Sequence, residues 1–241
     1  FTENPPYECP LNAFVSDSFY CFARLCDAVR PELSEHYDAL HTKLNRHIHE
    51  AFFDAERNVY LTRLNDRQRP LHAFTQALAI YVGATPETVK PAVAENMLSK
   101  EMIPCTLSAS IYEYDVLLQM GDTYRAYVRR EVEEVWGKML YAGATTFWED
   151  FNIEWTKNAA RIDELVPEGK VDVHQSYGDY CYKGFRHSLC HGWASGPTAW
   201  LSRYVLGVQV LEPGCKKVRI EPHLGNLKWV EGTFPTPHGD I

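Results

Sequence analysis

The sequence contains no long hydrophobic run and no run of basic residues. Its apolar stretches are short and interrupted by charge, far below the roughly 20 consecutive apolar residues that a membrane-spanning helix needs. Runs of Lys or Arg longer than two are absent, and 32 acidic residues outnumber 24 basic ones, which gives a formal net charge of -8. Such a surface is poorly suited to neutralise a phosphate backbone. We therefore expect no nucleic acid and no membrane among the partners of this chain.

The cysteines and histidines show no metal-binding spacing. Seven cysteines, an odd number, are scattered along the chain without a CxxC pair. His187 and His191 are four residues apart, but no HExxH motif accompanies them, so a zinc site is not expected. The first residues contain neither an initiator Met nor the apolar core of a signal peptide. We therefore expect the true start to lie upstream or to have been removed, and the sequence indicates no localisation.

What the sequence does contain is a large apolar fraction arranged mostly in helical periodicity. Of its 241 residues, 45% are hydrophobic and 13% aromatic, which is enough to bury a sizeable core. Apolar residues that recur every three or four positions predict helices. The expected helices cover 15–29, 33–52, 71–82, 86–99, 108–120, 122–141 and 187–206, with a short strand or hairpin within 54–69 and a loop-rich, aromatic insertion at 150–184.

The pattern changes to a two-residue period after Gly207. Val218 and Ile220 alternate with Lys217 and Arg219, which is typical of a β-strand. Too few strands follow to close a sheet with protected edges. We therefore predict two domains, 1–207 and 208–241, and expect both ends of the chain to be cut from a longer protein.

Two segments contain residues suited to carbohydrate chemistry. In the first, a predicted helix ends at a small-residue turn that is followed directly by Trp148 and Glu149. A sugar stacks its apolar face on an aromatic ring, and its glycosidic bond is broken by two carboxyl groups. The alternative is that Trp148 is a core residue, while Glu149 and Asp150 only face solvent.

The second segment runs from Ser188 to Gly207. His191 and Trp193 lie near its start, among small residues that allow close packing. These two side chains can line a substrate pocket, although a histidine at such a position is also often a packed core residue.

Four stretches resemble bacterial α-L-rhamnosidases of the six-hairpin glycosidase superfamily (glycoside hydrolase family 78). They are GATTFWED from Gly143, SLCHGWASGPTAWLSRYVLG from Ser188, the run from Pro213 to Gly225, and WVEGTFPTPHGDI from Trp229. They occur in the same order as in the family, and the stretch FTQALA from Phe74 is similar to a helix of that family. The resemblance implies a C-terminal fragment that is mainly α, a partial (α/α)6 six-hairpin barrel followed by the start of a C-terminal β-sandwich.

The same resemblance implies an inverting hydrolase of terminal α-L-rhamnosyl linkages in glycans or glycosides. Glu149 would be the general base that activates water, and His191, Trp148 and Trp193 would bind the sugar. No metal and no cofactor are implied, because water and two carboxyl groups suffice. The general acid of the family lies on an acidic motif further upstream, and no such motif occurs between Phe1 and Leu71. The fragment alone is therefore expected to be inactive.

Two other functions fit the same residues. One is a six-hairpin glycosidase with another sugar specificity, in which Asp150 or Glu154 is the working carboxylate. The other is a non-catalytic, carbohydrate-binding half-barrel.

The helix count also carries a prediction about partners. A closed ring of six hairpins takes twelve helices, and the sequence predicts seven. Apolar faces between Val15 and Val29, or on the last helix, would then lack neighbours, which favours a homo-oligomer or another form of self-association.

Overall fold

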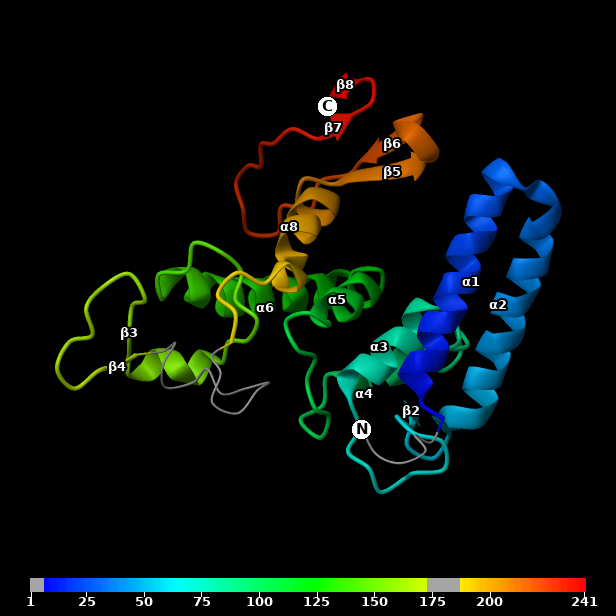
Figure 1. The fold of residues 1–241 in the computed structure, drawn as a ribbon, viewed down its shortest axis with the longest axis horizontal. Helices are drawn as coiled ribbons and strands as arrows, with labels where there is room; N and C mark the ends of the chain where they lie inside the picture. The colour runs from blue at the N-terminus through cyan, green and yellow to red at the C-terminus, as the bar shows by residue number, and fades with distance from the viewer. Residues whose placement is uncertain (1–6, 173–186) are drawn as a thin grey trace. The chain divides into compact units, whose positions relative to one another are not determined.

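The computed structural model describes residues 7–172 and 187–241 (Figure 1). The chain divides into two compact units, residues 1–121 and residues 122–241, and each is described by itself. The fold is mainly α, as predicted, with seven α-helices in the described residues. None of these helices is both long and apolar enough to cross a membrane.

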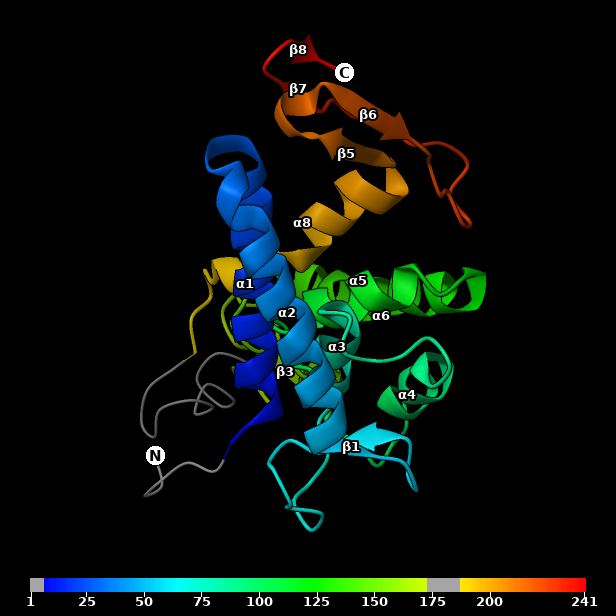
Figure 2. The same ribbon diagram turned by 90° about the vertical axis from the view of Figure 1, so that its right-hand side faces the viewer.

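The first unit begins with a helical hairpin. Helix α1 (Cys9–Val29) and helix α2 (Pro31–Phe52) lie side by side in both views (Figures 1 and 2) and are separated only by Arg30. Small buried residues of α1, including Ala13 and Ser16, allow close packing against α2. The Ser16 hydroxyl donates to Asn45 Oδ1 at 2.6 Å. The predicted pair of helices is confirmed, but α1 begins earlier than position 15, because Pro10 occupies its first turn.

A short hairpin follows, as the sequence predicts. Strand β1 (Phe53–Asp54) pairs antiparallel with strand β2 (Val59–Tyr60), with Phe53 opposite Tyr60. The Asp54 side chain is only 1% exposed. It accepts hydrogen bonds from Arg67 Nη2 at 2.6 Å and from Arg57 Nε at 3.0 Å. These ion pairs fasten the hairpin to the loop that follows it.

The core of the first unit is built around helix α3 (Ala73–Tyr81), in which every residue from Thr75 to Ile80 is buried. The buried Gln76 side chain accepts from the Tyr60 amide at 2.7 Å and donates to the Tyr60 carbonyl at 2.9 Å, which ties α3 to β2. Helices α4 (Lys90–Met97) and α5 (Ser110–Leu118) complete this unit. All three helices are confirmed, although each is shorter than its predicted range.

The second unit begins with helix α6 (Asp122–Tyr141), within the predicted bounds. The chain turns at Gly143, which has a φ of +94°, and a Cβ there would lie 2.7 Å from Asp163 Oδ1. A 3-10 helix (Ile153–Lys157) and a parallel pair of two-residue strands, β3 (Ala159–Ala160) and β4 (Val171–Asp172), follow. The aromatic part of the predicted insertion, 174–182, lies outside the described residues.

The last predicted helix starts later than position 187. Residues 187–191 form backbone hydrogen bonds with the segment 147–149. A 3-10 turn follows at Gly192–Ala194, and helix α8 covers only Gly196–Trp200. The chain continues as a π-helical turn (Leu201–Val205) and changes direction at Gly207, whose φ is +81°. A Cβ at Gly207 would lie 2.2 Å from the carbonyl carbon of Glu221, so only glycine fits this close crossing.

The predicted β segment is confirmed. Strand β5 (Val208–Glu212) pairs antiparallel with strand β6 (Lys217–Ile220), as Figure 2 shows. A second short pair joins β7 (Pro235–Thr236) to β8 (Gly239–Asp240).

Candidate functional site

The Glu149 carboxylate is held by the backbone of Ser188. The Ser188 amide donates to Glu149 Oε2 at 2.8 Å. The Glu149 amide in turn donates to the Ser188 carbonyl at 2.8 Å. The first hydrogen bond restrains the side chain of Glu149 and the second restrains its main chain, so both parts of the residue are held against Ser188.

The same ladder places His191 beside this carboxylate segment. The His191 amide donates to the Phe147 carbonyl at 2.7 Å, and the Thr146 hydroxyl donates to the Leu189 carbonyl. The segments 146–149 and 188–191 therefore run antiparallel to each other, although neither is a regular strand. This pairing brings the backbone of His191 next to the segment that carries Glu149, although the two lie far apart in the sequence.

Trp193 lies in the 3-10 turn that follows His191. Its side chain is 80% exposed, and its ring is 6.3 Å from the His191 ring, edge to face. The turn is anchored to α6, because Trp136 Nε1 donates to the Ala194 carbonyl at 2.9 Å. Trp193 thus presents an open aromatic face next to His191.

Trp148 occupies a different position from Trp193. Its side chain is 0% exposed and packs against Phe151 and His187, with ring centroids 5.6 Å and 6.4 Å away. Its backbone amide donates to the Met139 sulfur at 3.5 Å. This placement matches the core-residue alternative for Trp148, whose ring does not offer a face to solvent.

The other two carboxyl groups near Glu149 have different surroundings. Burial raises the pKa of Asp150, and the charge of Glu149 raises it further, while the Phe151 amide and His187 oppose this shift. Glu154 forms an ion pair with Lys157 on the exposed 3-10 helix. Of the three, Glu149 is the one whose carboxylate is fixed by a backbone amide across the site.

Several supporting residues were not found by sequence reasoning. His187 and Trp155 pack together at 5.8 Å beside Trp148, and Trp136 bonds to the 3-10 turn. These contacts involve backbone atoms and tertiary packing, so no local motif indicates them. Within residues 7–172 and 187–241, no group of His, Cys, Asp or Glu side chains is arranged to hold a metal ion.

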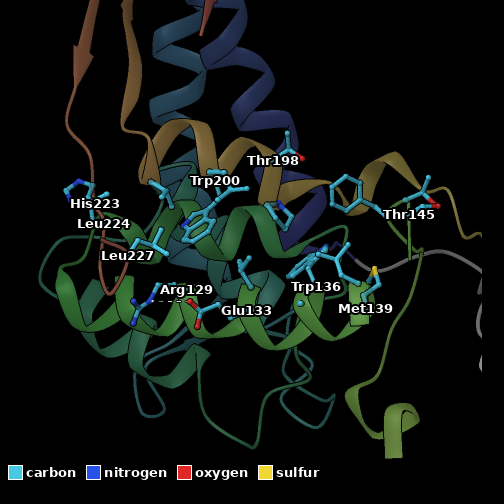
Figure 3. Close-up of a pocket in the computed structure, with 18 residues that line it drawn as sticks. Arg129, Glu133, Trp136, Met139, Thr145, Thr198, Trp200, His223, Leu224 and Leu227 are labelled. Carbon is cyan, nitrogen blue, oxygen red and sulfur yellow. Dashed lines mark ion pairs between the residues drawn. The ribbon is translucent and has the colours of Figure 1, made fainter. Parts of the chain in front are cut away.

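The second unit also contains an apolar cavity of about 460 Å³ (Figure 3). Trp136 and Met139 line it from α6, and Trp200 lines it from α8. His223, Leu224 and Leu227 close one end. Arg129 and Glu133 form an ion pair on its floor, 4.0 Å apart. Glu149, His191 and Trp193 do not line this cavity, but Thr146 and Phe147 do, so the cavity adjoins the segment that carries Glu149.

Solved structures with a similar fold include several rhamnosidases. The rhamnosidase of Bacillus sp. GL1 superposes with a TM-score of 0.74 at 20% identity, over 96% of this chain and 23% of that one. The α-L-rhamnosidase of Dictyoglomus thermophilum gives 0.67 at 19% identity, over 95% and 23%. That of Streptomyces avermitilis in complex with L-rhamnose gives 0.58 at 18% identity, over 95% and 20%. The chain thus spans about a quarter or less of the length of these relatives.

Family-level comparison covers almost the whole chain. No curated protein matches it. The family model for the bacterial alpha-L-rhamnosidase 6 hairpin glycosidase domain matches residues 8–205, and that for the bacterial alpha-L-rhamnosidase C-terminal domain matches residues 207–241. The chain therefore belongs to the bacterial α-L-rhamnosidase family, and it contains part of the six-hairpin glycosidase domain followed by part of the C-terminal domain.

Proposed function

We propose that the intact protein hydrolyses terminal α-L-rhamnosyl linkages with inversion and that Glu149 is the general base. The observation that carries this proposal is the carboxylate of Glu149, fixed by the Ser188 amide at 2.8 Å in the segment that also holds His191. A base that must direct a water molecule at one face of a sugar gains from such preorganisation.

The reaction needs a second carboxyl group. In an inverting glycosidase, an acid protonates the leaving oxygen while the base takes a proton from the attacking water, and the two carboxyl groups stand about 6.5 to 9.5 Å apart. We propose that the acid comes from a part of the intact protein outside this chain, since no matching acidic motif occurs before Leu71. The 241-residue chain alone would then lack hydrolytic activity.

The surroundings of the neighbouring carboxyl groups favour Glu149 as the base. The Asp150 carboxyl group is hydrogen-bonded by the amide of its own chain neighbour, Phe151. Glu154 is engaged with Lys157 on an exposed turn. Neither has the backbone anchoring that Glu149 receives from Ser188.

The proposed sugar site combines one polar and two aromatic residues. His191 would hydrogen-bond to sugar hydroxyls, and the exposed ring of Trp193 would stack on the apolar face of the sugar. Trp148, fully buried, would shape the site through its packing next to Glu149 in the chain. Rhamnose is the proposed sugar because the family is that of α-L-rhamnosidases, and L-rhamnose is bound in the Streptomyces avermitilis enzyme.

We also propose Gly207 as the boundary between the two domains, 1–207 and 208–241. The helical part ends at Val205, and Gly207 has the positive φ that redirects the chain into β5. The two family models meet between residues 205 and 207.

For the isolated chain, we propose self-association through α1. Five apolar side chains of α1 follow one another at intervals of three, four or seven residues, and each is between 44% and 62% exposed: Leu11, Val15, Phe22, Leu25 and Val29. This spacing is typical of a helix that packs along another helix. We call these five residues the α1 stripe.

The test of the proposed activity is hydrolysis of an aryl α-L-rhamnoside by the full-length protein, with the released sugar followed by NMR. Inversion predicts that β-L-rhamnose appears first and then mutarotates. A first product with retained configuration would contradict the mechanism. Activity on another glycoside only would indicate a different sugar, and sugar binding without any hydrolysis would indicate a binding protein.

The role of Glu149 can be separated from a general loss of structure by chemical rescue. Replacing Glu149 by Ala removes the base and leaves space for a small anion such as azide. We expect azide to restore turnover of a substrate with a good leaving group and to form a β-rhamnosyl azide.

A further inference from the structure

We propose that His187 is a positioning residue: packed among aromatic side chains, it holds the Ser188 amide against the Glu149 carboxylate. This inference rests on the proposed role of Glu149 as the base. It adds a residue whose contribution is indirect, since the backbone of Ser188, and not the His187 ring, contacts the carboxylate.

His187 belongs to a closed cluster of four rings. Trp148, Phe151, Trp155 and His187 form successive contacts, with centroid distances of 5.6, 6.0, 5.8 and 6.4 Å around the ring of four. Trp148 is 0% exposed and His187 is 3% exposed. We call these residues the aromatic cluster. Since its members restrain one another, the His187 side chain has little freedom to move.

The peptide bond carries this restraint to the site. The amide that binds Glu149 Oε2 belongs to the peptide group between His187 and Ser188. Because that group is planar and rigid, the direction of its N–H depends on the position of the His187 main chain. Removing the His187 ring therefore frees the donor that orients the carboxylate.

His191 and Trp193, the two proposed sugar-contacting residues, are anchored independently of His187. The His191 amide bonds to the Phe147 carbonyl at 2.7 Å, and Trp136 Nε1 bonds to the Ala194 carbonyl at 2.9 Å. These bonds remain when His187 is replaced. A change at His187 should therefore lower kcat and leave KM almost unchanged.

A second mode of action makes a different prediction. His187 also lowers the pKa of Asp150 through its charge, so it could act on the site electrostatically. His187→Phe keeps an aromatic ring in the cluster and removes the charge, whereas His187→Gln keeps a polar side chain and removes the ring. If packing carries the effect, His187→Phe preserves activity and His187→Gln does not.

The experiment compares wild type, Glu149→Gln, His187→Ala, His187→Gln and His187→Phe in the full-length protein on an aryl α-L-rhamnoside. We expect His187→Ala and His187→Gln to lower kcat about tenfold to a hundredfold, in line with a misplacement of the base by roughly 1 Å. Their KM should stay within about threefold of the wild-type value. His187→Phe should stay within about threefold of wild type. An unchanged kcat in His187→Ala and His187→Gln, or an equal loss of kcat in His187→Phe, would overturn the proposal.

Amide hydrogen exchange at Ser188 provides a readout that does not depend on activity. We expect slow exchange in wild type and in His187→Phe, and faster exchange in His187→Ala and His187→Gln. Equal protection in all four proteins contradicts the positioning role. If wild type does not hydrolyse the rhamnoside, the proposed function is contradicted. The positioning role of His187 is still tested in that case, because amide exchange at Ser188 does not require turnover.

Discussion

Asp54 is a buried carboxylate with two arginine partners. The hydrogen bond from Arg67 is the main cause that holds its pKa well below the usual range, and Arg57 contributes in the same direction. A group whose pKa is lower in the folded state stabilises the fold at every pH above its unfolded pKa of about 3.9. This stabilisation is lost as the pH falls below that value toward the folded pKa.

We therefore predict that Asp54→Asn lowers the stability of the full-length protein near pH 7 by about 2 kcal/mol. This loss of stability is smaller than the cost of breaking a fully buried ion pair, because both arginines are partly exposed. The measurement is the urea midpoint of wild type and variant at pH 7 and at successively lower pH. The difference should narrow below about pH 4, because wild type then loses what Asp54 contributes.

Glu56 supplies a matched control for Asp54. It pairs with the same Arg67 at 2.8 Å, but its side chain is 80% exposed. Glu56→Gln should change stability by less than about 0.5 kcal/mol, as is usual for a surface pair. Equal effects of the two substitutions, or a difference that widens at low pH, would contradict the account of Asp54.

At the scale of elements, apolar periodicity was a reliable guide to the existence of the long helices, where local forces decide. Helices α1, α2 and α6 follow from their apolar spacing, but α1 and α2 begin earlier than predicted, each with a proline in its first turn. The start of α8 was predicted too early. Residues 187–191 bond across to 146–149, and a sequence pattern does not reveal such long-range backbone pairing.

The junction between the last helical turn and β5 gives a second prediction. Gly207→Ala places a Cβ 2.2 Å from the Glu221 carbonyl carbon, on a backbone with a φ of +81°. Because a main-chain atom cannot easily move aside, we expect a loss well above the 1 to 2 kcal/mol of a left-handed residue alone, about 3 kcal/mol or more. If the crossing between Gly207 and Glu221 opens, the chain between them becomes accessible to protease. The rate of limited proteolysis in this segment of the full-length protein therefore measures the effect.

Gly214 is the control for Gly207. It also has a positive φ, +70°, but a Cβ there meets nothing within 4 Å. Gly214→Ala should cost only about 1 to 2 kcal/mol and leave cleavage between 207 and 221 near the wild-type rate. Similar cleavage in both variants would show that the close approach to Glu221 has no effect of its own.

At the scale of the whole molecule, the α1 stripe predicts association of the 241-residue chain. Val15 and Leu25 are 48% and 55% exposed, on the side of α1 away from the small buried residues that pack against α2. Replacing both by Lys should convert an oligomer into a monomer in sedimentation, because charged side chains cannot be buried in an apolar contact without a partner. Circular dichroism checks that helix content is unchanged.

A charge change on α2 tests whether the stripe itself is responsible. Glu35 is an exposed residue of α2, so Glu35→Lys alters charge without touching the stripe. This variant should associate like wild type. A wild-type chain that sediments as a monomer at high concentration contradicts the prediction.

The sequence indicates the proposed reacting groups of the candidate site, but it does not indicate the residues that support them. Glu149 and His191 stand out because a carboxylate beside Trp148 and a histidine among small residues suit sugar chemistry. The Ser188 amide, the aromatic cluster and the bond from Trp136 to Ala194 depend on how distant segments pack. No residue type or spacing indicates which backbone amide will meet a carboxylate.

The central claim is that Glu149 is the base of an inverting rhamnosidase, and one measurement tests it most directly. Hydrolysis of an aryl α-L-rhamnoside is compared for the full-length protein, its Glu149→Gln variant and the 241-residue chain. Gln keeps the size of the side chain but cannot accept the proton, so we expect full-length wild type to be active, kcat of the variant to fall by about 10²-fold to 10⁴-fold, and the chain alone to be inactive. A Glu149→Gln variant with kcat close to wild type would contradict the account.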